Sequence, residues 1–245
     1  MSKIVNRTLD FFEMFAAQKS PLSMTQMVKL LGIPMSSCFD VAQALEQRGY
    51  LYQLTERGSY YPTHRLIDVA QSIASFDPIV EQFESPLQAL CDEYRVSAWI
   101  GKVKDLAVVY LLVCNSDHPL SYKVSVGDSS RSLYATSSGK ALLGLLPGAQ
   151  LKKALSTITF SPLTPKTILS KQKLLKDIQN SVQRGWFLNQ EESVEDACAV
   201  SLTFRWNAAD YVLTAAGSVK QMERILPKLL VSCQRAIEQF TACEF

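Results

Sequence analysis

The chain has 245 residues, of which 47% are hydrophobic and 20% are charged, and lysine plus arginine exceed aspartate plus glutamate by only two. This composition belongs to a folded protein with its own core, and it excludes a disordered chain or a disulfide-stabilised miniprotein. The longest apolar run, residues 106–114, has nine residues, whereas a membrane-spanning helix needs about 20. We therefore expect a cytoplasmic protein with no membrane segment.

The first part of the chain has the pattern of a winged helix-turn-helix. Apolar residues at helical spacing over residues 7–17 (Leu9, Phe12, Phe15 and Ala16) predict a first helix. Ser23 and Gln26 form a capping box that begins a second helix, and Gly32 ends it. A third helix follows Ile33-Pro34 and ends at Gly49, and aromatic-rich runs at residues 50–54 and 59–61 predict a hairpin. Three helices followed by a hairpin are typical of DNA-binding domains, although a helical subdomain without a ligand has the same pattern.

The charge of this segment is nearly balanced, with six basic and five acidic side chains in residues 1–62. Affinity for DNA must therefore come from the local placement of charges or from several copies of the chain.

The rest of the chain alternates helical and extended patterns. Residues 63–76 predict a linker helix with an apolar stripe, formed by Leu66, Val69, Ala70 and Ile73, and a new domain begins at residue 77. Within it, extended runs at 96–100 and 106–114 predict a hairpin around 101–105. Residues 134–146 and 171–184 predict helices, runs at 197–204 and 211–216 predict strands joined by 205–210, and 219–240 predict a last helix. We interpret the chain as α+β with an antiparallel sheet, in three parts: residues 1–62, 63–76 and 77–245.

Signals for catalysis and metal binding are lacking. The six cysteines form no C-x-x-C pair, and no cysteine lies near either histidine at zinc-site spacing. The stretch 138–141 resembles the end of a phosphate-binding loop, but Tyr134 and Ala141 replace the required glycine and hydroxyl residue. A G-x-S-x-G elbow is absent too. We therefore expect no catalytic residue, no metal and no cofactor.

Glu191 and Glu192 are adjacent, so in a strand they would point to opposite faces and could not act on one atom. We expect them to form a solvated edge with one structural contact.

Five stretches, in this order, resemble the IclR-type bacterial transcriptional regulators: residues 27–34 leading into 45–51, then 135–143, 163–168, 184–186 and 191–192. The resemblance implies a winged helix-turn-helix, a linker helix, and a profilin-like or GAF-like C-terminal domain that binds a small-molecule effector. It also implies a double-stranded DNA operator as partner and assembly into homodimers or tetramers. The apolar stripe of the linker helix is then expected to form a dimer interface, because an apolar helix face is normally buried against another element.

Site residues follow from the resemblance and from helical spacing. For DNA they are Ser36, Ser37, Phe39, Asp40, Gln43 and Gln47 on the recognition helix, with Arg48 and Arg57 as contacts to the phosphates or the minor groove. Gln43 is the candidate to read adenine. For the effector they are Leu120, Tyr122, Ser137, Ser138, Gln190, Ala199, Thr214 and Ala216. An alternative is that the small members of this set only allow close packing.

The sequence also departs from the family pattern. Family recognition helices usually begin Pro-Lys-Ser-Thr and carry an arginine one turn later, but here Met35, Ser36, Ser37 and Asp40 occupy these positions. Both expected cations are missing. An effector-binding or interaction protein that has lost specific DNA recognition is therefore the alternative function. In the pocket, Ala199 and Ala216 replace a thiol and a hydroxyl residue, which predicts a larger or less polar effector.

Overall fold

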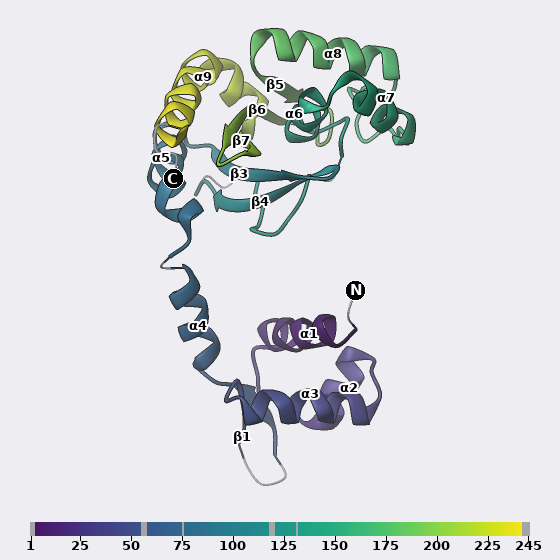
Figure 1. Cartoon of the computed structure of the whole chain (residues 1–245), viewed down its shortest axis with the longest axis vertical. Coiled ribbons are helices and arrows are strands. Elements are labelled where there is room, and N and C mark those ends of the chain that lie inside the picture. The colour runs from purple at the N-terminus through teal and green to yellow at the C-terminus, as the bar shows by residue number, and fades with distance from the viewer. Residues whose placement is uncertain (1–2, 55–57, 75, 118–120, 131, 242–245) are drawn as a thin grey trace. The chain divides into compact units, whose positions relative to one another are not determined.

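The computed structural model describes residues 3–54, 58–74, 76–117, 121–130 and 132–241. The chain divides into two compact units, Met1–Asp77 and Pro78–Phe245, and Figure 1 shows the elements of each. Within the described residues, every helix is too short or too polar to cross a bilayer.

The N-terminal unit consists of three helices, a short hairpin and a fourth helix. In chain order these are α1 (Lys3–Gln18), α2 (Met24–Leu31), α3 (Met35–Gln47), β1 (Leu51–Gln53), β2 (Tyr60–Pro62) and α4 (Arg65–Ala74). The capping box at the start of α2 is confirmed, because the Ser23 side chain accepts from Gln26 N while the Gln26 side chain accepts from Ser23 N. Gly32 ends α2 with φ 63°, a left-handed conformation that glycine adopts at low cost.

The buried face of α1 differs from the predicted one. Phe11, Met14 and Phe15 are buried against the other helices, whereas Leu9 is 55% exposed. The prediction is correct for Phe15 and for Phe12, which packs against this core, and wrong for Leu9 and Ala16. The difference arises because Phe11 and Phe12 are adjacent, and either can begin a helical stripe. Phe11 and Phe15, four residues apart, lie on the side that joins the core.

The C-terminal unit is a five-stranded antiparallel sheet with helices on both faces. Its elements are α5 (Pro78–Tyr94), β3 (Ser97–Lys104), β4 (Ala107–Cys114), α6 (Ser137–Leu145), α7 (Gly148–Thr157), α8 (Lys171–Arg184), β5 (Phe187–Gln190), β6 (Ala197–Trp206), β7 (Ala209–Ser218) and α9 (Val219–Thr241). The strand order is β4-β3-β7-β6-β5. Helices α5 and α9 cover one face, and α6, α7 and α8 lie over the other (Figure 1). The predicted α+β class with an antiparallel sheet is confirmed.

Strand alternation divides the core between these two faces. In β6, Val200 and Leu202 pack toward α5 and α9, while Ala199 packs toward α6. In β3, Ile100 faces the first side and Trp99 the second. Which residues can line a site under α6 is therefore fixed by their odd or even position in each strand.

Several predicted boundaries need correction. The β3–β4 turn lies at Asp105 and Leu106 rather than over residues 101–105, because Gly101 continues β3 at a register shift. A side chain at Gly101 would meet the Val108 side chain at 2.4 Å, so glycine allows the close pairing there. The β6–β7 turn consists only of Asn207 and Ala208, with φ of 45° and 58°, as in the tight turns that match strand twist.

Three further differences affect the region around α6. The helix begins at Ser137 rather than at residue 134, because Thr136 has extended backbone angles and caps it. Strand β5 and helix α7 were not predicted. Both are short, and β5 ends in the polar residues Asn189 and Gln190, which weaken a strand signal.

Candidate functional site

A small cavity lies between the first turn of α6 and the face of the sheet that α6 covers. Its volume is about 20 Å³, roughly the space of one water molecule. Its lining combines aromatic rings, small residues and hydroxyl or amide side chains: Trp99, Tyr110, Tyr122, Thr136, Ser137, Ser138, Asn189, Ser193, Ala197, Cys198, Ala199 and Ala216.

Five of the predicted effector residues line this cavity: Tyr122, Ser137, Ser138, Ala199 and Ala216. Ala199 and Ala216 are paired across β6 and β7, so two methyl groups lie side by side in its wall. Thr214 is buried on the same face, where its hydroxyl bonds Ser201 at 2.8 Å. Leu120 lies outside the described residues.

Gln190 lies on the opposite face of the sheet. Its side-chain nitrogen donates to Glu223 of α9 at 3.2 Å, away from α6. The neighbouring residue Asn189 lines the cavity instead, because successive side chains of β5 point to opposite faces.

Trp99 and Tyr110 are the main cavity residues that the sequence reasoning missed. The Trp99 ring lies 5.3 Å from the Tyr110 ring and 6.2 Å from the Tyr122 ring, measured between centroids, and it is stacked with Tyr122. These three rings form one aromatic side of the cavity, in which Tyr110 is tilted by 46° from Trp99. The extended run at residues 96–100 was predicted, but both of its faces are apolar, so the pattern could not select Trp99.

Hydrogen-bond donors in the lining give the cavity a preference for ligands that accept hydrogen bonds. The indole nitrogen of Trp99 is buried and has no hydrogen-bond partner among the described residues. Burial raises the pKa of Tyr110, while the Ser138 hydroxyl and the Trp99 N–H oppose that rise; the Trp99 N–H faces the Tyr110 oxygen but does not form a well-aligned hydrogen bond with it. The first residues of α6 are Ser137 and Ser138, and a helix N-terminus favours negative charge.

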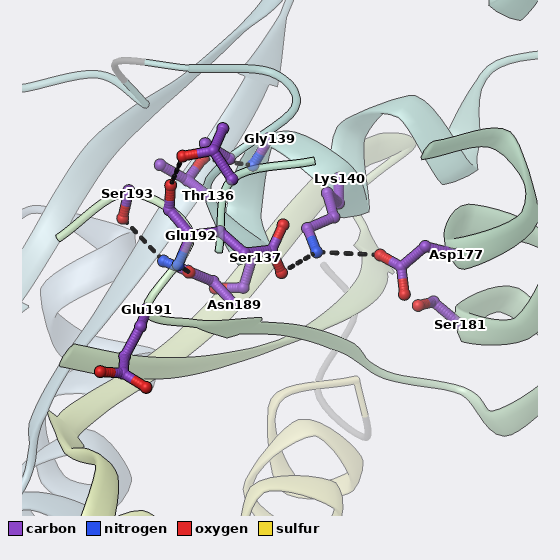
Figure 2. A network of polar contacts seen from close by, with 12 residues as sticks. Thr136, Ser137, Gly139, Lys140, Asp177, Ser181, Asn189, Glu191, Glu192 and Ser193 are labelled. Carbon is purple, nitrogen blue, oxygen red and sulfur yellow. Dashed lines mark hydrogen bonds and ion pairs between the residues drawn. The ribbon is translucent and has the colours of Figure 1, made fainter. Parts of the chain in front are cut away.

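The start of α6 is held in place by a buried lysine. Lys140 is only 1% exposed, and its Nζ donates to Asp177 Oδ2 at 2.9 Å and to Glu192 Oε1 at 2.6 Å. Figure 2 shows this ammonium group reaching Asp177 on α8. Lys140 therefore ties α6 to α8 and to the segment after β5.

The two adjacent glutamates differ in environment, which corrects the expected solvated edge. Glu192 is buried; burial raises its pKa, and Lys140 opposes this. Its Oε2 has no partner among the described residues. Glu191 has φ 61°, and Figure 2 shows its side chain pointing away from Lys140. It pairs instead with Lys166, which lowers the pKa of Glu191.

The segment 163–168 holds the backbone of both glutamates. Thr164 donates its hydroxyl to the carbonyl of Glu191 at 2.5 Å, and Thr167 donates to the carbonyl of Glu192 at 2.8 Å. Asn189 completes the arrangement, because its Oδ1 accepts from Glu192 N and its Nδ2 donates to Ser193 Oγ. Three of the stretches that carried the resemblance in this unit, residues 135–143, 163–168 and 191–192, thus meet in one polar network behind the cavity. Figure 2 shows the residues of the first and the last of them.

In the N-terminal unit, the predicted face of α3 is open. Ser36, Phe39, Asp40, Gln43 and Gln47 are exposed, as is Arg48. A groove of about 340 Å³ runs between α1 and the edge of α3, where it is lined by Arg7, Ser37, Asp40 and Arg48 among others. Ser37 and Asp40 therefore border α1, and Arg57 lies outside the described residues.

Both halves of the chain match models of one family. The IclR helix-turn-helix domain matches residues 5–55, and the C-terminal domain of bacterial IclR transcriptional regulators matches residues 70–241. The chain belongs to the IclR family. The members of this family are transcriptional regulators with a DNA-binding helix-turn-helix.

Individual relatives of the family agree over nearly the whole chain. The HTH-type transcriptional regulator XynR of Escherichia coli is 22% identical over 240 residues, which cover 96% of this chain and 92% of XynR. The IclR structure from Thermotoga maritima has a TM-score of 0.79 at 16% identity and covers 97% of each chain. An IclR homologue from Microbacterium hydrocarbonoxydans, solved in complex with 4-hydroxybenzoate, has a TM-score of 0.72 at 16% identity and covers 98% of this chain and 100% of its own.

Proposed function

We propose that the N-terminal unit binds a specific DNA operator and that a small molecule in the cavity beneath α6 changes the affinity for that operator. One observation supports the proposal most strongly: the cavity presents the buried indole N–H of Trp99, which forms no well-aligned hydrogen bond among the described residues, beside hydroxyl groups and stacked aromatic rings. An unpaired buried polar group costs free energy, so a cavity that was only a gap in packing would be expected to have an apolar lining.

The chemistry of the walls supports a planar molecule that carries a hydrogen-bond acceptor, such as a small carboxylate. Its ring would pack on Trp99 and Tyr122, and its acceptor would receive the Trp99 N–H and the hydroxyls at the start of α6. The complex of the Microbacterium homologue with 4-hydroxybenzoate supports the same class. The paired methyl groups of Ala199 and Ala216 leave more room than the thiol and hydroxyl residues that the family resemblance implies at these positions.

Entry requires movement of Tyr122. The cavity as it stands is too small for an aromatic acid, but an outer depression of about 610 Å³ adjoins it, and Tyr122 and Ala197 line both. Displacing the Tyr122 ring would join the two spaces. We propose that the effector is received in this way.

Trp99→Phe should lower the affinity for the effector about 10- to 100-fold, the equivalent of one hydrogen bond to a charged group. The change removes the N–H donor and keeps an aromatic ring. The measurement is calorimetric titration of the full chain with 4-hydroxybenzoate and with the acids that raise its melting temperature. Trp206→Phe is the control, since Trp206 packs on the other face of the sheet. Equal affinities of Trp99→Phe and the unchanged protein would reject this placement of the acceptor.

A second copy of the chain is proposed to cover the stripe on α4. No α4 side chain is buried, and Ile73 is 68% exposed. Ile73→Glu should shift the protein to a lower mass in sedimentation and weaken operator binding at least about 10-fold, because two linked sites bind more tightly than one. Gln71→Glu adds the same charge on the opposite side of the helix, and it should change neither the mass in sedimentation nor the operator affinity. A dimeric Ile73→Glu variant with normal operator affinity would place the dimer interface elsewhere.

The operator itself is tested by footprinting the DNA upstream of the protein's own transcription unit. We expect a palindromic protected site and a steep fall of affinity with salt, because several phosphate contacts release counterions.

A second function, effector binding without specific DNA recognition, is favoured by one observation. Helix α3 contains no lysine or arginine and two acidic residues, Asp40 and Glu46. Binding that is uniform along the DNA, with no protected site, would support this alternative and reject the operator proposal.

A further inference from the structure

The recognition helix exposes large apolar side chains at the end that enters DNA. Met35 is the first residue of α3 and is 50% exposed, and Phe39, one turn later, is 49% exposed. In a helix-turn-helix, the N-terminal residues of the second helix are those that contact base edges. These two side chains therefore lie on the surface that meets the major groove in the proposed complex.

The same helix lacks the groups that read guanine. Bidentate contacts from arginine or lysine to guanine O6 and N7 are the commonest specific contacts in the major groove, and α3 carries neither residue. Its exposed polar side chains are Ser36, Gln43, Glu46 and Gln47, and Ser37 and Asp40 lie at the edge next to α1. A glutamine amide can pair with adenine N6 and N7, and a carboxylate accepts only from an exocyclic amine.

An aromatic or thioether side chain has one specific partner in the major groove, the C5 methyl group of thymine. Contact with that methyl group removes apolar surface of both partners from water. Ser36 precedes Phe39 by three residues and Gln43 follows it by four, so the three side chains lie on one face of the helix and face the same bases. This continuity favours DNA over a protein as the occupant of the apolar surface.

Resting on the proposed operator binding, we infer that α3 reads an A·T-rich half-site, in which Phe39 and Met35 contact thymine methyl groups and Gln43 contacts adenine. The missing cations thus change the sequence that is recognised. Phosphate contacts come from residues outside α3, such as Arg48 and Lys29, both of which are exposed.

The test replaces single thymines of the footprinted site by deoxyuridine, which removes one methyl group and keeps the base pair. With the full-length protein we expect one or two positions per half-site at which affinity falls about 3- to 5-fold, the equivalent of ~0.8 kcal/mol for a buried methylene-sized group. The Phe39→Ala variant should bind the thymine site more weakly than the unchanged protein does. It should also bind the thymine site and the deoxyuridine site with equal affinity. Leu9→Ala, which shortens a comparably exposed apolar side chain on α1, should keep the full discrimination.

Other outcomes would overturn the inference, and they separate it from the operator proposal. A protected site whose affinity is unaffected by deoxyuridine but falls when 7-deazaguanine replaces guanine would show guanine readout, and operator binding would stand. Equal thymine discrimination by Phe39→Ala and the unchanged protein would remove Phe39 from the interface. The absence of any protected site would reject operator binding and the A·T-rich half-site together.

Discussion

Replacing Lys140 with methionine is expected to lower the free energy of unfolding of the C-terminal unit by about 3–5 kcal/mol at neutral pH, the usual cost of removing one partner of a buried ion pair. Methionine fills most of the same volume, so the loss is electrostatic. Asp177 is partly exposed and can be hydrated, but Glu192 is buried, and its carboxylate would lose the cation that stabilises its charge.

The effect should depend on pH in a defined direction. Burial raises the pKa of folded Glu192 above its ordinary value of about 4.5, and losing Lys140 should raise it further. A glutamate with a raised folded pKa contributes stability below its unfolded pKa and loses that contribution as pH rises through the folded pKa. The deficit of Lys140→Met should therefore be smallest near pH 4.5 and grow toward pH 7.

The measurement is urea unfolding of the full chain followed by tryptophan fluorescence. Trp99, Trp186 and Trp206 are the only tryptophans, and all three lie in the C-terminal unit. Lys166→Met is the matched control, because Lys166 is 58% exposed and pairs with the adjacent Glu191; its effect on the free energy of unfolding should be much smaller than that of Lys140→Met, because solvent screens an exposed ion pair. Adding Glu192→Gln to Lys140→Met should restore part of the loss. Equal effects of the two lysine variants would mean that Lys140 is not a buried anchor.

Gly139→Ala should destabilise the same unit by about 3 kcal/mol, the upper part of the range for overpacking. A β-carbon at Gly139 would lie 2.2 Å from the carbonyl oxygen of Ser132 and 2.7 Å from Cα of Leu133. Both are backbone atoms, so the neighbours cannot turn away. The first turn of α6 would have to shift, and Ser137 and Ser138 would move with it.

The control for Gly139→Ala is Gly148→Ala at the start of α7, where a β-carbon would meet nothing within 4 Å. Its effect should be neutral or slightly stabilising, since alanine loses less conformational entropy on folding. Both variants are compared by fluorescence-detected unfolding and by effector titration. If Gly139→Ala matches Gly148→Ala in both, the tight approach of α6 to residues 132–133 is not needed for the pocket.

Local signals were enough to predict much of the fold. The capping box at Ser23 and Gln26 and the glycine at position 32 fixed the ends of α2, because helix termini depend on a few neighbouring residues. The amphipathic pattern of α8 was equally clear, and its predicted limits agree with the observed ones. For α2 the deciding interactions lie within one helical turn, whereas for α8 the spacing of apolar residues was sufficient.

The cavity needed information that the local pattern lacks. Both faces of the sheet are covered by helices, so strands such as β3 are apolar on both sides, and no alternation marks the side that α6 covers. Trp99 was missed for this reason, whereas Asn189 was missed because β5 itself is short and ends in polar residues. Lys140 and Glu192 are 52 residues apart in the chain, and a pairing of that length is fixed only when α6, α8 and the segment after β5 pack together.

The coupling between the two units is tested most directly by measuring the affinity for the effector with and without operator DNA. Linkage requires that the operator change effector affinity by the same factor by which the effector changes operator affinity. We therefore predict that the operator changes effector affinity and the effector changes operator affinity by equal factors. Both changes should be lost in Ile73→Glu, and at a fixed effector concentration both should be smaller in Trp99→Phe. Specific operator binding and Trp99-dependent effector binding that leave each other's affinities unchanged would contradict an effector-controlled regulator.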